Sequence, residues 1–108
     1  MKYSIDEVAR ALSSAPRRRL LERVALGPVS MSALAEHLDL SLPAVDKHLK
    51  VLRSAGLVTK TKTGRVTRVT LDPRGLDAMG TWVERTRAHW AGAMQRYTDH
   101  LEDRWPKL

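Results

Sequence analysis

The segment Ser41-Leu-Pro-Ala-Val-Asp-Lys-His-Leu-Lys-Val-Leu52 decides the fold predicted for this chain of 108 residues. It opens on a serine, a residue that caps helix starts by accepting a hydrogen bond from a backbone N–H. Pro43 then falls in the first helical turn, where an amide hydrogen is not needed. Gly56 is a typical helix stop. The segment therefore predicts a helix from Leu42 to about Ala55.

The two sides of this helix differ in character. At 100° per residue its apolar side chains gather on one side, and they are Leu42, Val45, Leu49 and Leu52. The opposite side carries Pro43, Lys47 and Lys50, with Ala44 and His48 on one flank and Asp46 on the other. One side is predicted to pack, and the other is left free for recognition.

Three shorter helices are predicted before it, over about residues 5–12, 16–25 and 31–38. Each has apolar residues at helical spacing and its own start signal, which is Ser4, Pro16 and Ser30 in turn. The connection between the third helix and Ser41 is short, so the third and fourth helices must cross. This arrangement is typical of a helix-turn-helix.

The apolar period changes to two after Gly56. Residues 57–62 and 66–71 alternate as strands do, and Thr63-Gly64 is predicted as the turn between them, with Gly64 supplying a positive φ. The sequence thus predicts a two-stranded hairpin with a basic tip. With five helices in all, the fold class is mainly α with a small β-hairpin, which is a winged helix-turn-helix.

A last helix is predicted from Asp72-Pro73 to Pro106. Its roughly 30 residues span about 45 Å, which is longer than a helix needs to be to pack across the small domain formed by the preceding residues. One stripe carries most of the aromatic residues: Met79, Trp82, Val83, Thr86, Trp90, Ala93, Met94, Tyr97 and Leu101. Part of this stripe is expected to meet a second subunit. The predicted interface joins the first and last helices through Ile5, Val8, Trp90, Met94 and Tyr97.

The net charge of +7 is concentrated in one segment. Residues 41–71 hold seven basic residues and the single acid Asp46, whereas the six basic and six acidic residues of 72–108 cancel. Such a basic region fits a polyanionic partner, and a solvated basic face is the plainer interpretation.

Composition excludes several other classes. The chain has no cysteine, which excludes disulfides, thiolate metal sites and cysteine nucleophiles. No leader and no apolar run of about 18 residues is recognisable, so a cytoplasmic protein without membrane contact is expected. The length predicts one domain, 1–108. Acids and histidines are scattered and no glycine-rich phosphate loop is present, so an enzyme is not expected.

The 41–52 segment, together with Ala55-Gly-Leu-Val58 and Gly64-Arg65, resembles the ArsR-type repressors, and the similarity extends over nearly the whole chain. The resemblance implies a homodimer that binds an inverted-repeat operator in double-stranded DNA and blocks transcription until a signal releases it. The sequence does not identify the inducer. No cofactor is expected.

Two sets of DNA contacts are predicted. The residues expected to read base edges are Ser41, Pro43, Ala44, Asp46, Lys47 and His48, although Ser41 is also an N-cap and His48 can be a packing residue. The residues expected to hold phosphates are Arg17, Arg18, Lys50, Lys62, Arg65 and Arg68.

Asp46 opposes its cationic neighbours, and two interpretations stay open. As an acid four residues before Lys50, it can stabilise the helix by about 0.2 to 0.5 kcal/mol. Alternatively, its carboxylate accepts a hydrogen bond from cytosine N4 in the major groove.

The sequence leaves three alternatives open: a metal-responsive repressor, an RNA-binding module and a protein-interaction module. The first is metal sensing: His89, His100 and Asp103 resemble three of the four ligands of zinc-binding relatives, but Arg87 replaces the fourth, so no metal site is expected. A winged helix can also bind RNA or another protein. Structured RNA has a narrow major groove that excludes a helix, which favours DNA.

Overall fold

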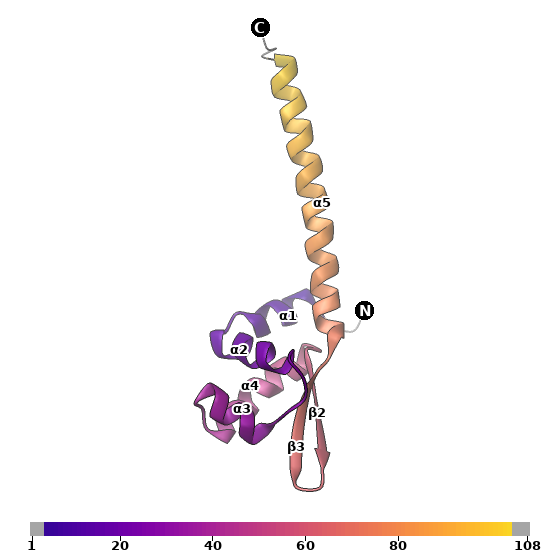
Figure 1. Cartoon of the computed structure of the whole chain (residues 1–108). Coiled ribbons are helices and arrows are strands. Elements are labelled where there is room, and N and C mark those ends of the chain that lie inside the picture. Colours follow the sequence, from indigo (N-terminus) through magenta and orange to yellow (C-terminus); the bar gives the residue numbers. More distant parts are fainter. Residues whose placement is uncertain (1–3, 105–108) are drawn as a thin grey trace.

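The computed structural model describes residues 4–104 of the chain (Figure 1). Its elements are α1 (Ile5–Leu12), α2 (Ala15–Val24), β1 (Val29–Ser30), α3 (Met31–Leu38), α4 (Leu42–Ser54), β2 (Val58–Thr63), β3 (Val66–Leu71) and α5 (Pro73–Arg104). All five predicted helices and the hairpin are confirmed. The predicted end of the last helix at Pro106 lies outside the described residues.

Serine caps start the first four helices. The hydroxyls of Ser4, Ser14, Ser30 and Ser41 each accept a hydrogen bond from the amide three residues later, at 3.0 to 3.4 Å. Three of these caps belong to the predicted starts, and Ser14 begins α2 just before Pro16. Local capping therefore fixes where the helices begin, independently of tertiary contacts.

The core lies between the four short helices and the sheet. Its fully buried side chains include Leu20, Leu34, Leu49, Leu52 and Leu57. The buried face of α4 is Val45, Leu49 and Leu52, as predicted, whereas Leu42 is half exposed at the helix start. The packed side of α4 thus orients its other side outward.

The sheet has three strands rather than the two predicted from sequence, in the order β1-β3-β2 and antiparallel throughout. Val29 pairs with Val69 and Ser30 with Arg68, which ties the start of α3 to the hairpin. A two-residue strand is too short to produce a period in sequence.

The turn of the hairpin is one residue later than predicted. Thr63 pairs with Val66, so Gly64 and Arg65 form the tip, with Gly64 at φ +62°. Glycine in the first central position with a positive φ suits a two-residue hairpin turn. Arg65 therefore stands at the very end of the hairpin, which from here is called the wing (residues 58–71).

The beginning of α5 docks against the end of α4. The amide of Asp72 donates to the Leu57 carbonyl at 2.9 Å and that of Gly75 to the Gly56 carbonyl at 2.8 Å. Asp72, only 5% exposed, binds Arg74 through Oδ2 at 2.7 Å. Hydrogen bonding to Arg74 lowers the pKa of the Asp72 carboxyl. These contacts set the direction in which α5 leaves the rest of the molecule, α1 to β3, which from here is called the head.

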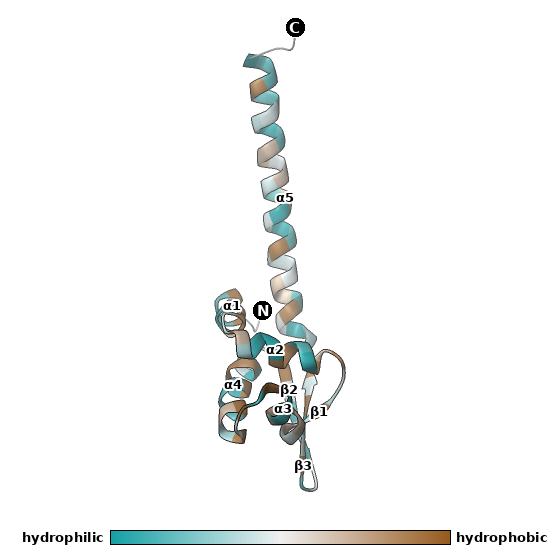
Figure 2. Ribbon diagram, turned by 60° about the vertical axis from the view of Figure 1, so that its left-hand side comes forward, coloured by the Kyte–Doolittle hydropathy of each residue, from teal (hydrophilic) through white to brown (hydrophobic). Residues whose placement is uncertain are grey.

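Beyond this joint, α5 projects away from the head, and the molecule extends over 73 Å in its longest direction (Figure 1). Apolar bands alternate with polar ones along the helix (Figure 2). Only Gly75 and Ala78 of α5 are buried. Among the described residues no helix combines the length and apolarity needed to cross a membrane.

Candidate nucleic-acid interface

The outward side of α4 presents the residues predicted to read bases. Ser41, Pro43 and Lys47 are exposed, and Ala44, Asp46 and His48 are partly exposed. The Ser41 hydroxyl accepts a hydrogen bond from the Ala44 amide at 3.3 Å, so its capping role is confirmed. The six residues lie at and just after the start of one helix, which the geometry of the major groove can accommodate.

The wing supplies a second basic element. Lys62 and Arg65 are exposed at and near its tip, and Arg68 is exposed opposite Thr61. Within residues 4–104, none of these three cations has a carboxylate partner. They are therefore available to an external anion.

The start of α4 and the wing border one hollow. A space of about 480 Å³ is lined by Ser30, Met31, Ser32, Leu42, Arg65, Val66, Thr67 and Arg68. The starts of α3 and α4 and the basic tip of the wing consequently belong to one continuous surface.

Arg17 and Arg18 are predicted to hold phosphates, and in the structure their guanidiniums donate hydrogen bonds to backbone carbonyls of α1. Arg17 donates through Nε to the Ala11 carbonyl at 2.7 Å and through Nη2 to the Arg10 carbonyl at 2.9 Å. Arg18 donates to the Leu12 carbonyl at 2.7 Å. Both guanidiniums donate to carbonyls in the last turn of α1, and the Arg10 carbonyl also accepts from the Ser13 amide and hydroxyl. These contacts join α1 to α2 and leave other guanidinium N–H donors of both residues, so the phosphate contact stays a prediction.

Asp46 links α4 to the wing. Its Oδ1 lies 3.1 Å from Nζ of Lys60 on β2, and its Oδ2 lies 3.6 Å from Nζ of Lys50. The hydrogen bond and charge of Lys60 lower the pKa of the Asp46 carboxyl, with a further contribution from Lys50. The predicted pair with Lys50 is confirmed, and the Lys60 contact is new. Sequence reasoning missed it because the two residues lie fourteen positions apart on different elements.

His48 is partly buried beside two cations. Burial lowers the pKa of its imidazole, and the charges of Arg17 and Lys47 lower it further. The neutral form is therefore favoured at neutral pH, and this form offers one donor and one acceptor. The side chain retains partial exposure, so the predicted packing and reading roles are both compatible with its position.

The predicted dimer residues fall into two groups. Trp90, Met94 and Tyr97 are 68, 43 and 57% exposed, and Ile5 is partly exposed. Val8 was predicted in the interface but is fully buried in the core of its own chain, so that prediction was wrong. Its position on the apolar face of α1 is right, but that face is covered by the other helices of the head.

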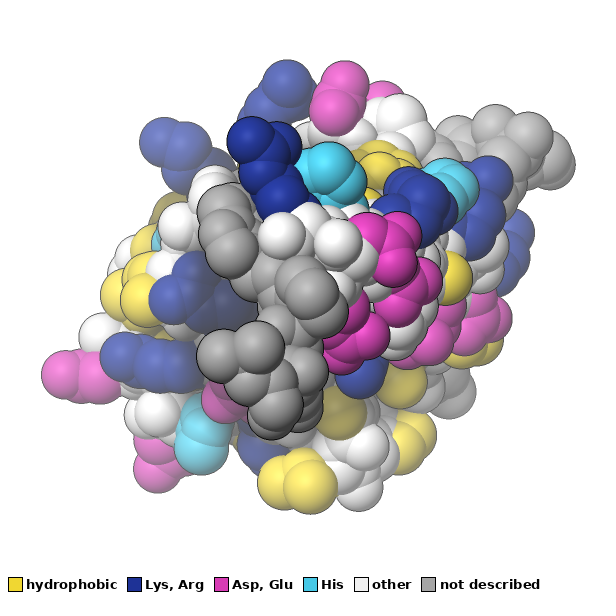
Figure 3. Space-filling model, turned by 90° about the horizontal axis from the view of Figure 1, so that it is seen from above, with side chains coloured by type: hydrophobic (Ala, Val, Ile, Leu, Met, Phe, Trp, Pro, Cys, Tyr) yellow, Lys and Arg dark blue, Asp and Glu magenta, His cyan; other side chains and the backbone are white. Residues whose placement is uncertain are grey.

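The outer half of α5 brings no metal ligands together within one chain. Across residues 4–104, no group of three His, Asp or Glu side chains could hold an ion. Arg87, which replaces the fourth ligand, lies 3.7 Å from Glu84, and Gln95 donates to Asp99 at 2.9 Å. Seen from above, several acidic side chains lie together on the right of the view (Figure 3).

The crossing helices α3 and α4, followed by a basic wing, define a winged helix-turn-helix protein. A family model described as a helix-turn-helix domain matches residues 7–61. The chain is 38% identical to the HTH-type transcriptional regulator Rv2034 of Mycobacterium tuberculosis over 99 residues, 92% of this chain and 90% of that relative. It belongs to the ArsR-type family of helix-turn-helix transcriptional regulators.

Further similarities agree with this assignment. The transcriptional repressor SdpR of Bacillus subtilis is 25% identical over 79 residues, 73% of this chain and 88% of the repressor. The structure of an ArsR-like transcriptional regulator from Rhodococcus sp. RHA1 superposes with a TM-score of 0.83 at 30% identity, covering 92% of this chain and 91% of that one. The similarity spans head and α5 together, and the family consists of regulators rather than enzymes.

Replacing Asp46 by Ser is expected to tighten binding to non-specific duplex DNA. Lys50 and Lys60 would lose their shared carboxylate, and a negative charge would leave the surface. Fluorescence anisotropy with a duplex of random sequence measures this effect, and weaker binding would contradict the charge argument.

The same variant tests the cytosine contact. If Asp46 reads cytosine N4, Asp46→Ser also erases the preference at one symmetric operator position, where a wrong pair otherwise costs about 1 to 3 kcal/mol. If every position keeps its discrimination, Asp46 acts only through the two lysines.

Proposed function

We propose that this protein is a homodimeric, sequence-specific DNA-binding repressor of an inverted-repeat operator. The observation that carries the proposal is the adjacency of α4 and the basic wing, which border one hollow at Leu42 and Arg65 and are joined by the Asp46–Lys60 ion pair. The reading side of α4 would enter the major groove through Ser41, Pro43, Ala44, Asp46, Lys47 and His48. Lys50, Lys62, Arg65 and Arg68 would hold phosphates on either side of the groove.

The outer part of α5 supports the homodimer. A monomer would leave its stripe of large apolar side chains in water, and Trp82, Val83, Trp90, Met94 and Tyr97 are all at least 36% exposed. Such a continuous apolar stripe is typical of an interface. A two-fold axis along α5, with Ile5 of α1 at its border, would place two heads on the same side and match a two-fold operator.

Repression and location follow from the proposed activity. The similarity to a transcriptional repressor of Bacillus subtilis supports repression over activation. A dimer bound across an operator blocks polymerase by occupying the site, without a further domain. The cytoplasm is the proposed compartment because bacterial chromosomal DNA lies there.

Selection of bound duplexes from a random pool tests the proposal. We expect an imperfect inverted repeat with half-site centres one helical turn, about 34 to 36 Å, or a multiple of it apart. A gel-shift competition with duplex RNA distinguishes the RNA-binding alternative. Recovery of no consensus, or better competition by RNA than by DNA, would refute the proposal.

Removing a wing cation should flatten the salt dependence of DNA binding. Each phosphate contact contributes about 0.9 to the slope of log K against log salt, so Arg65→Ala or Lys62→Ala should reduce the slope by about two units in a dimer with two wings. Both variants should weaken binding to all sequences alike. Arg85→Ala, an exposed arginine of α5 outside the stripe, is the matched control. An unchanged slope would exclude the wing from the contacts.

A further inference from the structure

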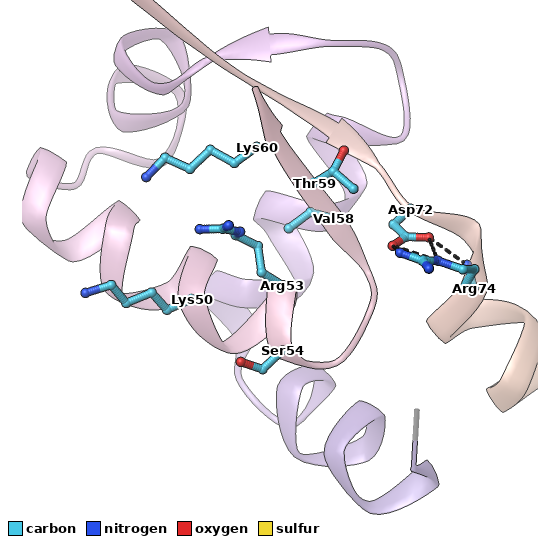
Figure 4. Close-up of a pocket in the computed structure, with 8 residues that line it drawn as sticks. All are labelled: Lys50, Arg53, Ser54, Val58, Thr59, Lys60, Asp72 and Arg74. Atoms are coloured by element: carbon cyan, nitrogen blue, oxygen red, sulfur yellow. Dashed lines mark hydrogen bonds and ion pairs between the residues drawn. The ribbon is translucent and has the colours of Figure 1, made fainter. Parts of the chain in front are cut away.

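A second hollow lies at the other end of α4. It measures about 590 Å³, is open to solvent, and is bordered by the C-terminal half of α4, the start of β2 and the start of α5 (Figure 4). Pockets for small molecules commonly measure about 300–1,000 Å³. The hollow is therefore large enough for a small organic ligand.

Cationic side chains dominate one part of this hollow. Lys50, Arg53 and Lys60 all line it, and Figure 4 shows them on the same side of β2 with their heads pointing the same way. The carboxylate of Asp46 pairs with both lysines. Three cations against one carboxylate leave two positive charges, which a dianion would neutralise.

The remaining polar groups do not remove this excess. Asp72 is already bound to Arg74 on the other side of β2 in Figure 4, at 2.7 Å. Ser54 adds a hydroxyl group to the lining, whereas the Thr59 hydroxyl is hydrogen-bonded to the Thr70 hydroxyl at 2.7 Å. The hollow thus offers hydrogen-bond donors and positive charge together, the combination that recognises phosphate.

Arg53 is the centre of this arrangement. In the described part of the chain its guanidinium has neither an ion pair nor a hydrogen bond. The side chain lines the hollow between α4 and β2. A guanidinium presents five N–H donors in a planar fork that matches two phosphate oxygens. Arg53 is therefore available for a bidentate contact inside the hollow.

The part of the hollow around Arg53 lies beyond the start of α4 and the wing tip, although Lys50 belongs both to the hollow and to the proposed phosphate contacts. Arg53 lies ten residues beyond Pro43, about 15 Å along α4, and Thr59 lies five residues before the tip glycine, about 16 Å along β2. A duplex held by the start of α4 and the wing tip would leave the Arg53 region open. A free anion can therefore reach it.

We propose that this hollow binds a small organic phosphate and that the bound phosphate weakens DNA binding. The second half rests on the proposed function. A phosphate on Arg53 would draw Lys50 and Lys60 away from Asp46. Lys50 would then no longer contact the DNA backbone. The Asp46 carboxylate, left without its lysine partners, would repel the DNA phosphates.

Binding is tested on the full chain with inorganic phosphate as the probe. Phosphate is titrated into 15N-labelled protein at constant ionic strength, balanced with sodium chloride. Saturable amide shifts are expected at Ser54, Val58 and Thr59. Arg53→Gln should weaken the binding at least tenfold, and Arg85→Gln, which removes the same charge on α5, should not. Shifts centred on the wing tip, or equal affinities in the two variants, would overturn the proposal.

Coupling is tested with an operator duplex at the same ionic strength. Phosphate should lower the affinity of the parent for DNA, whereas Arg53→Gln should bind DNA within about threefold of the parent and resist phosphate. A loss of tenfold or more in Arg53→Gln without phosphate would make Arg53 a DNA contact and refute the effector site. A parent that binds phosphate but no duplex would refute the proposed function instead.

Discussion

Met94→Glu is expected to give a monomer that has lost operator binding. Met94 lies in the middle of the exposed apolar stripe of α5 and is 43% exposed in the single chain. A two-fold interface contains two copies of each residue, so the substitution introduces two carboxylates into an apolar seam. An unpaired buried charge costs several kcal/mol, so the dimer dissociation constant should rise at least about a hundredfold. Sedimentation measures the dissociation, and anisotropy measures the parallel loss of DNA affinity.

Ala91→Glu is the matched control for this prediction. It introduces the same carboxylate three residues earlier, at an exposed position of α5 outside the stripe. Dimerisation and operator binding should be retained. If Met94→Glu stays fully dimeric, the interface lies elsewhere. If it is monomeric but binds the operator unchanged, two-fold recognition is wrong.

The helices could be predicted because their signals are local. A serine at the cap, a proline in the first turn and a glycine after the last turn act within a few residues of each boundary. Thus α4 begins at Leu42 as predicted and ends at Ser54, one residue before the expected end. The division of α4 into a buried side and an outward side follows from the same helical period.

The features missed from the sequence depend on contacts between elements. Periodicity shows that Val8 lies on an apolar face, but it does not show whether the same chain or a partner covers that face. The capping of α1 by Arg17 and the pairing of Asp46 with Lys60 both require the relative placement of two elements. Strand β1 exists only because Val29 reaches Val69 across the sheet.

These missed contacts bear directly on the candidate site. Arg17 and Arg18 resemble phosphate ligands in sequence because they form a basic run, and the structure adds hydrogen bonds from their guanidiniums to carbonyls of α1. Arg53 carries no signal in sequence because it lies beyond the reading turns of α4. Only the fold places it between Lys50 and Lys60, beside the joint that carries α5.

Gly75→Ala is expected to destabilise the protein and to disturb DNA binding through the joint between α4 and α5. A Cβ on Gly75 would lie 2.5 Å from the Ala55 carbonyl oxygen and 2.8 Å from that of Gly56. Both obstacles are backbone, so the start of α5 must move away and strain the 2.8 Å hydrogen bond from the Gly75 amide. Overpacking of this kind costs about 1 to 3 kcal/mol, which corresponds to a fall in Tm of roughly 10 °C for a domain of this size.

Gly80→Ala separates this steric effect from the general effect of replacing a helical glycine. Gly80 lies five residues later in α5, and a Cβ added there would meet no atom within 4 Å, so the same substitution should stabilise the helix by about 0.5 to 1 kcal/mol. Thermal unfolding of the two variants should therefore shift in opposite directions. Because the joint sets the angle between the reading helix and the proposed dimer helix, Gly75→Ala should also weaken binding to the operator more than to a single half-site, measured below its melting temperature. A Gly75→Ala variant with unchanged Tm and unchanged operator preference would show that α5 does not need this close approach.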